Sequence, residues 1–289
     1  MLINSKIILI VYVCIAEYKN LFSFPPYSFV PHNRSKEELE HFIRKLEQQA
    51  LETAEEREPI YIKAGLKDAS LVLDVGCGNG AVTRDICNHT NGFVIAIDDS
   101  EDMIEIAKEM LIGVRNVQLC RGDAHSLPFK DETFDIAICN LLLMWVKDPQ
   151  QVVNEMARVV KKGGKVVASL EPDFGGKIHW PPYPEVDEIF AGRAIKNRGG
   201  DPYIGRKLRM LFVRAGLKTE VGLGNLRIWS CEEDKKSYMR ARDFYWNVLR
   251  REGLKEEEIK KWEEHYLKSI EEGIEFNFFP QFYAIGVKK

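Results

Sequence analysis

The sequence has no strong excess of either charge and no paired-cysteine motif. Its 41 basic and 44 acidic residues leave a formal charge of −3. That balance excludes a protein that holds nucleic acid by its overall charge alone. None of the six cysteines belongs to a C-x-x-C pair, and several lie in apolar runs. This pattern argues against a disulfide framework or a zinc site, so we expect no metal and a reducing, cytoplasmic location.

The N-terminal region has no apolar run long enough for a bilayer. Ile7–Ala16 is apolar over ten residues, whereas a membrane-spanning helix needs about 20. Glu17 and Lys19 follow at once, and no small-x-small cleavage site is visible. Three interpretations stay open: an upstream extension of uncertain start, an element packed on the body, or a weak membrane-facing segment. We favour the first two and expect no stable membrane span.

The chain has enough apolar residues for a folded core. Its 289 residues are 45% hydrophobic, which excludes a disordered chain and allows one large domain or two small ones. Residues 22–31 contain three prolines and read as a linker. Ser35–Glu38 forms a capping box. It predicts a helix that ends near Pro59, and a further helical turn is predicted over 61–66.

Short apolar strands then alternate with amphipathic helices. Strands are predicted at 71–75, 93–97, 117–120, 134–139 and 165–170, and helices at 79–88, 101–111 and 149–160. This alternation is typical of an α/β fold with a parallel sheet and helices on both faces. Further along, we expect a helix at 203–215, a strand at 217–223, charged helices within 232–272 and a last strand at 276–287.

The most informative motif is Val72–Gly80, VLDVGCGNG. A buried strand runs into three glycines at alternate positions, where the backbone can turn tightly and a ligand can approach the main chain. The spacing differs from the G-x-G-x-x-G of dinucleotide sites. Asp74 precedes the glycines and suits an ammonium group better than a pyrophosphate. Asp98 follows Gly78 by 20 residues, where a carboxylate accepts ribose hydroxyls.

These features resemble the class I S-adenosylmethionine-dependent methyltransferases. The similarity is greatest to the small-molecule group that includes the quinone-biosynthesis (ubiquinone and menaquinone) C-methyltransferases. Four segments carry it: LDVGCGNG (73–80), AIDDSEDMIEIA (96–107), GDAHSLPF (122–129) and FDIAICNLLLMWVKDP (134–149). The resemblance implies a Rossmann-like, seven-stranded, mostly parallel sheet with helices on both faces, and S-adenosylmethionine as the cofactor.

The resemblance also implies a set of cofactor-binding positions. Asp74 and the backbone of the glycine turn would hold the methionine part, Asp98 the ribose, Asp99 and Met103 the adenine ring, and Asp123 the adenine amino group. Asn140 would lie near the sulfonium. The full set is Asp74, Gly76, Cys77, Gly78, Gly80, Asp98, Asp99, Met103, Asp123, Ala124 and Asn140. Taken singly, Asp123 also fits a turn, Met103 a core position and Asp99 a solvent-exposed or capping carboxylate.

The acceptor side of the site is less defined by the sequence. Asn140 is followed by aliphatic residues and lacks the Asn/Asp-Pro-Pro-Tyr signature of methyltransferases that act on nucleic-acid amines or glutamine. Ligands of open α/β sheets lie outside the carboxyl ends of the strands. The pocket candidates are Trp145, Trp180, Tyr183, Tyr203, Arg206, Trp229 and Tyr245. A base is needed only where the acceptor carries a proton at the wrong pKa, and its candidates are His179, Glu171 and Asp173; for His125 a hydrogen-bonded surface role is favoured.

We expect methyl transfer to a small molecule by in-line displacement. Two alternatives stay open: a methyltransferase for RNA or protein, with Arg193–Arg209 supplying basic residues, and a non-catalytic cofactor-binding regulator. The expected organisation is an N-terminal extension and linker (1–34), a helical lid (35–66), a cofactor-binding core (67–231), a helical insertion as substrate lid (232–275) and a final core strand (276–289). The acceptor, the oligomeric state and the pathway are not specified by these patterns.

Overall fold

A computed structural model describes residues 36–224 and 231–289. The expectations for residues 1–34, the Ser35 cap and Trp229 lie outside this part. Within it, a seven-stranded sheet has the order β3-β2-β1-β4-β5-β9-β7. The bounds are β1 (Leu71–Val75), β2 (Phe93–Asp98), β3 (Val117–Arg121), β4 (Phe134–Cys139), β5 (Val160–Pro172), β7 (Lys218–Leu223) and β9 (Gln281–Val287). The first five strands run parallel, and β9 lies antiparallel between β5 and β7.

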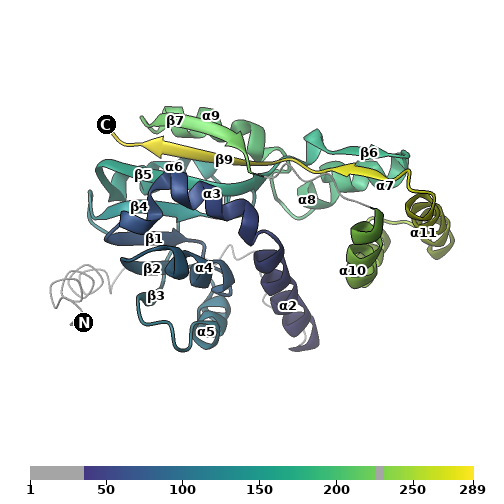
Figure 1. Ribbon diagram of the computed structural model, residues 1–289, viewed down its shortest axis with the longest axis horizontal. Coiled ribbons are helices and arrows are strands. Elements are labelled where there is room, and N and C mark those ends of the chain that lie inside the picture. The colour runs from purple at the N-terminus through teal and green to yellow at the C-terminus, as the bar shows by residue number, and fades with distance from the viewer. Residues whose placement is uncertain (1–35, 225–230) are drawn as a thin grey trace.

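Helices cover both faces of this sheet because its strands alternate two sets of apolar side chains. Leu71, Leu73 and Val75 of β1 face the helices α6 (Pro149–Val159) and α9 (Ile204–Arg214). Val72 faces the opposite layer, to which α3 (Ala54–Ala64) and α4 (Ala81–His89) belong. α5 (Glu101–Met110) packs beside β2 and β3. Figure 1 shows both layers. The expected Rossmann-like fold, mostly parallel with helices on both faces, is confirmed.

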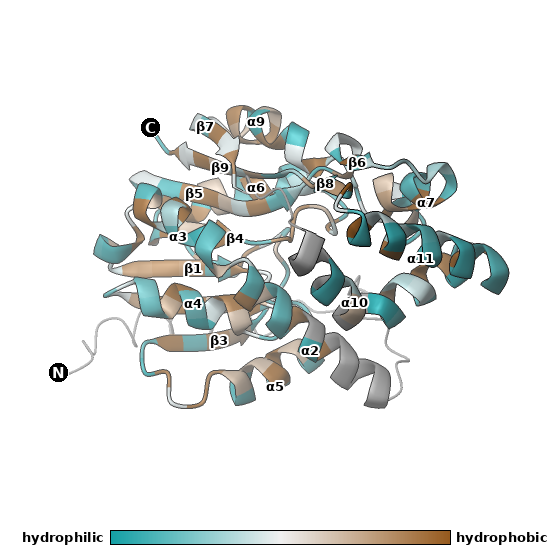
Figure 2. Cartoon of the chain, turned by 45° about the vertical axis from the view of Figure 1, so that its right-hand side comes forward, coloured by the Kyte–Doolittle hydropathy of each residue, from teal (hydrophilic) through white to brown (hydrophobic). Residues whose placement is uncertain are grey.

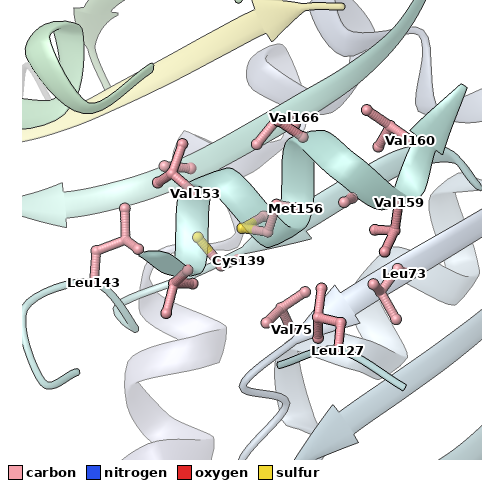
Figure 3. Close-up of a cluster of buried hydrophobic side chains, with 14 of the residues drawn as sticks. Leu73, Val75, Leu127, Cys139, Leu143, Val153, Met156, Val159, Val160 and Val166 are labelled. Carbon is pink, nitrogen blue, oxygen red and sulfur yellow. The ribbon is translucent and has the colours of Figure 1, made fainter. Parts of the chain in front are cut away.

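The largest core cluster lies between the sheet and α6. Figure 3 shows part of it, with Val153 and Met156 of α6 above Cys139 of β4. All three side chains are buried. Because β1, β2 and β4 are buried on both faces, they read as nearly continuous apolar runs, which is why the sequence pattern could locate them.

A second group of elements extends beyond the carboxyl ends of the parallel strands (Figure 1). A two-stranded ribbon joins β6 (Ile178–Trp180) to β8 (Phe276–Phe278). Around it lie α7 (Pro184–Glu188), α10 (Cys231–Arg251) and α11 (Glu256–Glu271), with an aromatic cluster that includes Tyr238, Trp246 and Trp262. The outer faces of α10 and α11 are largely hydrophilic (Figure 2). No helix of the described residues is both long and apolar enough to cross a membrane.

Five further elements complete the described chain. They are α2 (Lys36–Glu52), α8 (Ala194–Lys196), two 3-10 turns at Leu66–Asp68 and Phe174–Gly176, and a π-helical turn at Ile189–Arg193. The sequence of the proline-rich stretch after β5 did not predict β6, α7 or this turn. Pro and Gly residues there indicate loops, whereas these short elements form through contacts with distant segments.

Two predicted boundaries are wrong. The first helix ends at Glu52, and Pro59 lies inside α3 rather than at the end of a helix. Burial of Arg57, Ile60 and Tyr61 against the core outweighs the hydrogen bond that proline cannot donate. The predicted strand at 276–287 is two strands, β8 and β9, which belong to different sheets. Pro280 lies between them and lacks a backbone donor.

Candidate active site

The glycine turn connects β1 to α4 at the carboxyl edge of the sheet. Gly76, Gly78 and Gly80 have φ angles of 73°, 52° and 82°, in the left-handed region that favours glycine. The backbone N–H groups of Gly76 and Cys77 both donate to the carbonyl oxygen of Ile97, at 2.8 and 3.0 Å. The turn is therefore fastened to β2, and the carboxyl ends of both strands meet there.

Two of these glycines differ in what surrounds them. A Cβ atom at Gly76 would lie 2.6 Å from Cδ1 of Leu142, whereas nothing lies within 4 Å of a Cβ atom at Gly78. Leu142 belongs to the turn after β4 and covers Gly76. The backbone at Gly78 is thus the open part of the turn, where a ligand can reach the main chain.

This difference predicts separate effects for two substitutions. Gly76→Ala should destabilise the fold by about 2–3 kcal/mol, because it combines a left-handed backbone with a steric overlap. Gly78→Ala carries only the backbone penalty of about 1 kcal/mol, but its methyl group would occupy the open side and weaken ligand binding. Urea denaturation of both variants measures the stabilities. Equal losses of stability would contradict the assignment of an open and a covered glycine.

Two acidic side chains hold the turn from either side. Asp74 is buried and accepts a hydrogen bond from the hydroxyl group of Thr83 on α4, at 2.7 Å. Asp98 accepts from the backbone N–H of Gly78 through Oδ2, at 2.8 Å, and from that of Ser100 through Oδ1, at 3.0 Å. Each oxygen of Asp98 keeps a second lone pair, so the carboxylate can still accept from a diol.

The acids at this edge are unusually hard to ionise. Burial raises the pKa of Asp74 to about 7. Burial also raises the pKa of Asp98, although backbone donors oppose it. For Asp99, burial and the neighbouring charge of Asp98 raise the pKa to about 6. None of the three forms an ion pair with a cation in the described residues. This group of acids lacks a neutralising positive charge, and a cationic ligand would supply it.

The positions expected to surround adenine follow β2 and β3. Ser100, not Asp99, caps α5 by accepting from the N–H of Met103. Met103 is buried and Asp99 is partly exposed. Asp123 is exposed and accepts through Oδ1 from the backbone N–H of His125, with the Nδ1 atom of that ring 2.7 Å from the same oxygen. Asp123 thus forms a turn with His125.

The turn after β4 is held by β5. Asn140 accepts a hydrogen bond from the hydroxyl group of Ser169, at 2.7 Å. Leu141 adopts a φ of 54°, which is uncommon for a residue with a side chain. The Oε1 atom of Glu171 accepts from the N–H groups of Leu142 and Leu143, at 3.0 and 3.1 Å.

The three candidate bases have different environments. Glu171 is fully buried, and burial raises its pKa to about 7. Asp173 forms a two-pronged ion pair with Arg206, at 2.6 and 2.7 Å, so this carboxylate is already neutralised. His179 lies between Asp187, 2.9 Å away, and Glu275, 3.0 Å away. Burial opposes protonation of the His179 ring, but these two carboxylates outweigh it and raise its pKa.

The expected pocket residues are not all brought together. Tyr245 lines a pocket with His179, and the ring of Tyr183 lies 5.2 Å from the ring of His179. Trp180, on the other side of β6, is 59% exposed. The Tyr203 ring lies below the cations of Lys196 and Arg206, and Trp145 packs against the core. Tyr183 and Tyr245 thus lie near His179 and the helices α10 and α11, whereas Tyr203 and Arg206 lie at the start of α9.

Sequence reasoning missed three residues that position the others. Thr83 binds Asp74, Ser169 binds Asn140, and Leu142 covers Gly76. Their only sequence signal was their place within the helix after the glycine turn, in the fifth strand and in the turn after the fourth. No residue type among them stands out by composition, because threonine, serine and leucine are common in cores and turns.

Three of the six basic residues considered for phosphate binding form ion pairs. Arg193 lies within 4 Å of carboxylate oxygens of Glu188 and Glu252. Lys207 pairs with Asp201, as Arg206 does with Asp173. In the part of the chain that the structure describes, no group of three or more His, Cys, Asp or Glu residues is placed to hold a metal ion.

Comparison with known proteins agrees with this geometry. Residues 73–168 match the family model described as a methyltransferase domain. This chain carries a class I methyltransferase domain. The matched residues run from the glycine turn through β5 and contain every expected cofactor-binding position. The expected resemblance to the quinone-biosynthesis methyltransferases is also confirmed.

Among curated proteins, demethylmenaquinone methyltransferase from Bacillus cytotoxicus is 42% identical over 106 residues, which cover 35% of this chain and 45% of that protein. The chain therefore matches less than half the length of this relative. An uncharacterized methyltransferase from Schizosaccharomyces pombe is 29% identical over 199 residues, covering 65% of this chain and 71% of that protein. Among solved structures, a putative sarcosine dimethylglycine methyltransferase from Galdieria sulphuraria has a TM-score of 0.55 at 19% identity, covering 83% and 86% of the two chains. It shares the methyltransferase domain fold.

Proposed function

We propose that this protein transfers a methyl group from S-adenosylmethionine to a small-molecule acceptor. The observation that carries the proposal is the group of unpaired acids, Asp74, Asp98 and Asp99, around a glycine turn with open backbone at Gly78. S-adenosylmethionine carries an ammonium group, a sulfonium and a ribose diol, and each matches one feature of this edge. S-adenosylmethionine is the cofactor of the domain.

The cofactor supplies an electrophilic methyl group on a sulfur that already leaves readily. The chain's own residues have to bind the cofactor and the acceptor, orient them towards each other and exclude water. Asp98 would accept the ribose hydroxyls while it fixes the Gly78 and Ser100 backbone. Asp74 would meet the ammonium group, and Asn140, oriented by Ser169, would lie beside the reacting atoms. None of these roles consumes a proton, so in-line displacement proceeds without a base when the acceptor is already nucleophilic.

A small-molecule acceptor is supported by the relatives and by the lid. The curated relative from Bacillus cytotoxicus is named for a quinone precursor. Beyond the carboxyl edge, α10, α11 and the β6–β8 ribbon gather aromatic side chains with His179. We assign these elements to the substrate lid, and Tyr183, Tyr245 and His179 to its acceptor side. Cys77, Cys87, Cys120 and Cys139 are free thiols, which supports the expected cytoplasmic location.

Two measurements test this proposal. Isothermal titration with S-adenosylmethionine should show binding in the micromolar range, and absence of binding to a folded sample would remove the proposal. Incubation with methyl-labelled cofactor and a metabolite extract should give an extractable labelled product that Asp98→Ala protein does not form. Binding without any labelled product would favour the non-catalytic regulator instead, and label on added RNA or protein would favour the macromolecular acceptor.

A further inference from the structure

Glu171 is a buried acid with one carboxylate oxygen that accepts hydrogen bonds and one that has no hydrogen-bond partner. Its side chain comes from the carboxyl end of β5 and is fully buried. Oε1 accepts from the Leu142 and Leu143 N–H groups. Oε2 is buried without a hydrogen-bond partner. An unpaired buried carboxylate oxygen is costly, so its presence at the edge of the site calls for a functional explanation.

A short chain of contacts connects Glu171 to the glycine turn. The backbone of Leu142 binds Glu171, and the Leu142 side chain covers Gly76. The same turn begins at Asn140, the residue that the proposed function places beside the sulfonium. Glu171 therefore contacts the turn that begins at Asn140, in a buried site where a charge is only weakly screened.

No described cation neutralises Glu171. Asp173, just past the end of β5, is paired with Arg206. On β4, the thiol of Cys139 is the titratable group that senses Glu171, and burial raises its pKa well above the ordinary value, so it stays neutral near pH 7. On β9, Glu171 is opposite the apolar Phe282. Glu171 thus contributes an uncompensated negative charge whenever it is ionised.

We propose that Glu171 is a positioning residue that makes the site prefer the sulfonium form of the cofactor over the neutral thioether product. This inference rests on the proposed function. Ionised Glu171 holds the turn after β4 through two N–H groups and favours a positive charge in front of it. After transfer the positive charge on sulfur is gone, so the product S-adenosylhomocysteine loses this attraction and leaves more readily.

The test compares the affinities of S-adenosylmethionine and S-adenosylhomocysteine by titration calorimetry between pH 6 and pH 8. Both ligands carry the same ammonium, ribose and adenine groups, so the ratio of their dissociation constants isolates the methyl group and its charge. In the wild type this ratio should move towards S-adenosylmethionine by about tenfold as the pH rises through 7, where Glu171 ionises. Glu171→Gln, which keeps the shape, should lose most of this change.

The matched control is Glu275→Gln, which alters a fully buried carboxylate of the lid and should leave the ratio and its pH dependence unchanged. Asp74 also ionises near pH 7, and Asp74→Asn removes its contribution. If Glu171 is responsible, the ratio in Asp74→Asn should still depend on pH. This variant serves as the test if Glu171→Gln does not fold. A ratio in Glu171→Gln equal to that of the wild type, or a flat ratio in Asp74→Asn, overturns the inference while the proposed function stands. Failure of the wild type to bind either ligand overturns both.

Discussion

Asp98→Ala is expected to weaken S-adenosylmethionine binding by at least about 100-fold. The substitution removes the carboxylate that would accept the ribose hydroxyls, and each charge-assisted hydrogen bond is worth about 1.5–3 kcal/mol. It also releases the N–H groups of Gly78 and Ser100, so the open backbone of the turn loses its fixed position. Titration calorimetry on the folded variant measures the change.

Two further variants make this result interpretable. Asp98→Asn keeps one acceptor oxygen and should retain more affinity than alanine, with a loss of about tenfold. Asp102→Ala changes an exposed acid in the first turn of α5, the helix that follows Asp98, and should bind as the wild type does. A dissociation constant for Asp98→Ala within about twofold of the wild-type value would mean that the diol is held elsewhere.

The ligand-free protein is expected to become less stable as the pH rises from 5 to 8. The folded pKa values of Asp74 and Glu171 are raised to about 7, above the ordinary values of about 4 that they have in the unfolded chain. The folded state therefore holds more protons than the unfolded state in this window, and the free energy of unfolding falls with pH. At ~1.4 kcal/mol for each unit of pKa difference, the loss is a few kcal/mol, or about 5–10 °C in Tm.

Scanning calorimetry at constant ionic strength measures this slope. The double variant Asp74→Asn, Glu171→Gln should have a much flatter profile and a higher Tm than the wild type at pH 8. His179 contributes in the same direction, because its raised pKa means that its ion pairs weaken as the pH rises. A wild-type Tm that increases between pH 5 and pH 8 would contradict the assignment of buried, unpaired acids to this edge.

The strands of the sheet could be located from the sequence because burial and backbone geometry restrict which residues can stand at each position. β1, β2 and β4 are buried on both faces, so their apolar runs are continuous, and the glycines after β1 need left-handed backbone that few other residues adopt. The spacing from Gly78 to Asp98 predicted a ribose-binding acid, whereas the other cofactor-binding positions were predicted from the resemblance to a known family. The carboxyl ends of the parallel strands predicted the edge of the sheet at which the glycine turn meets Asp98.

What the sequence could not predict depends on pairing between distant segments. β6 has three residues and exists because β8, about 100 positions later, pairs with it. The roles of Asp173 and His179 were undetermined for the same reason, since Arg206, Asp187 and Glu275 come from other elements. An isolated acid or histidine in a sequence looks the same whether it is free to take a proton or held between partners.

One feature of the fold bears on how the chain is made. Strand β9 lies between β5 and β7, although it follows both in the chain, and β8 just before it pairs with β6. During synthesis, neither β7 nor the β6 ribbon can find its neighbour until residues 276–287 have left the ribosome. The unpaired edge of β5 is meanwhile a place where other nascent chains could add a strand. The sheet is therefore expected to close only after residues 276–287 have been synthesised.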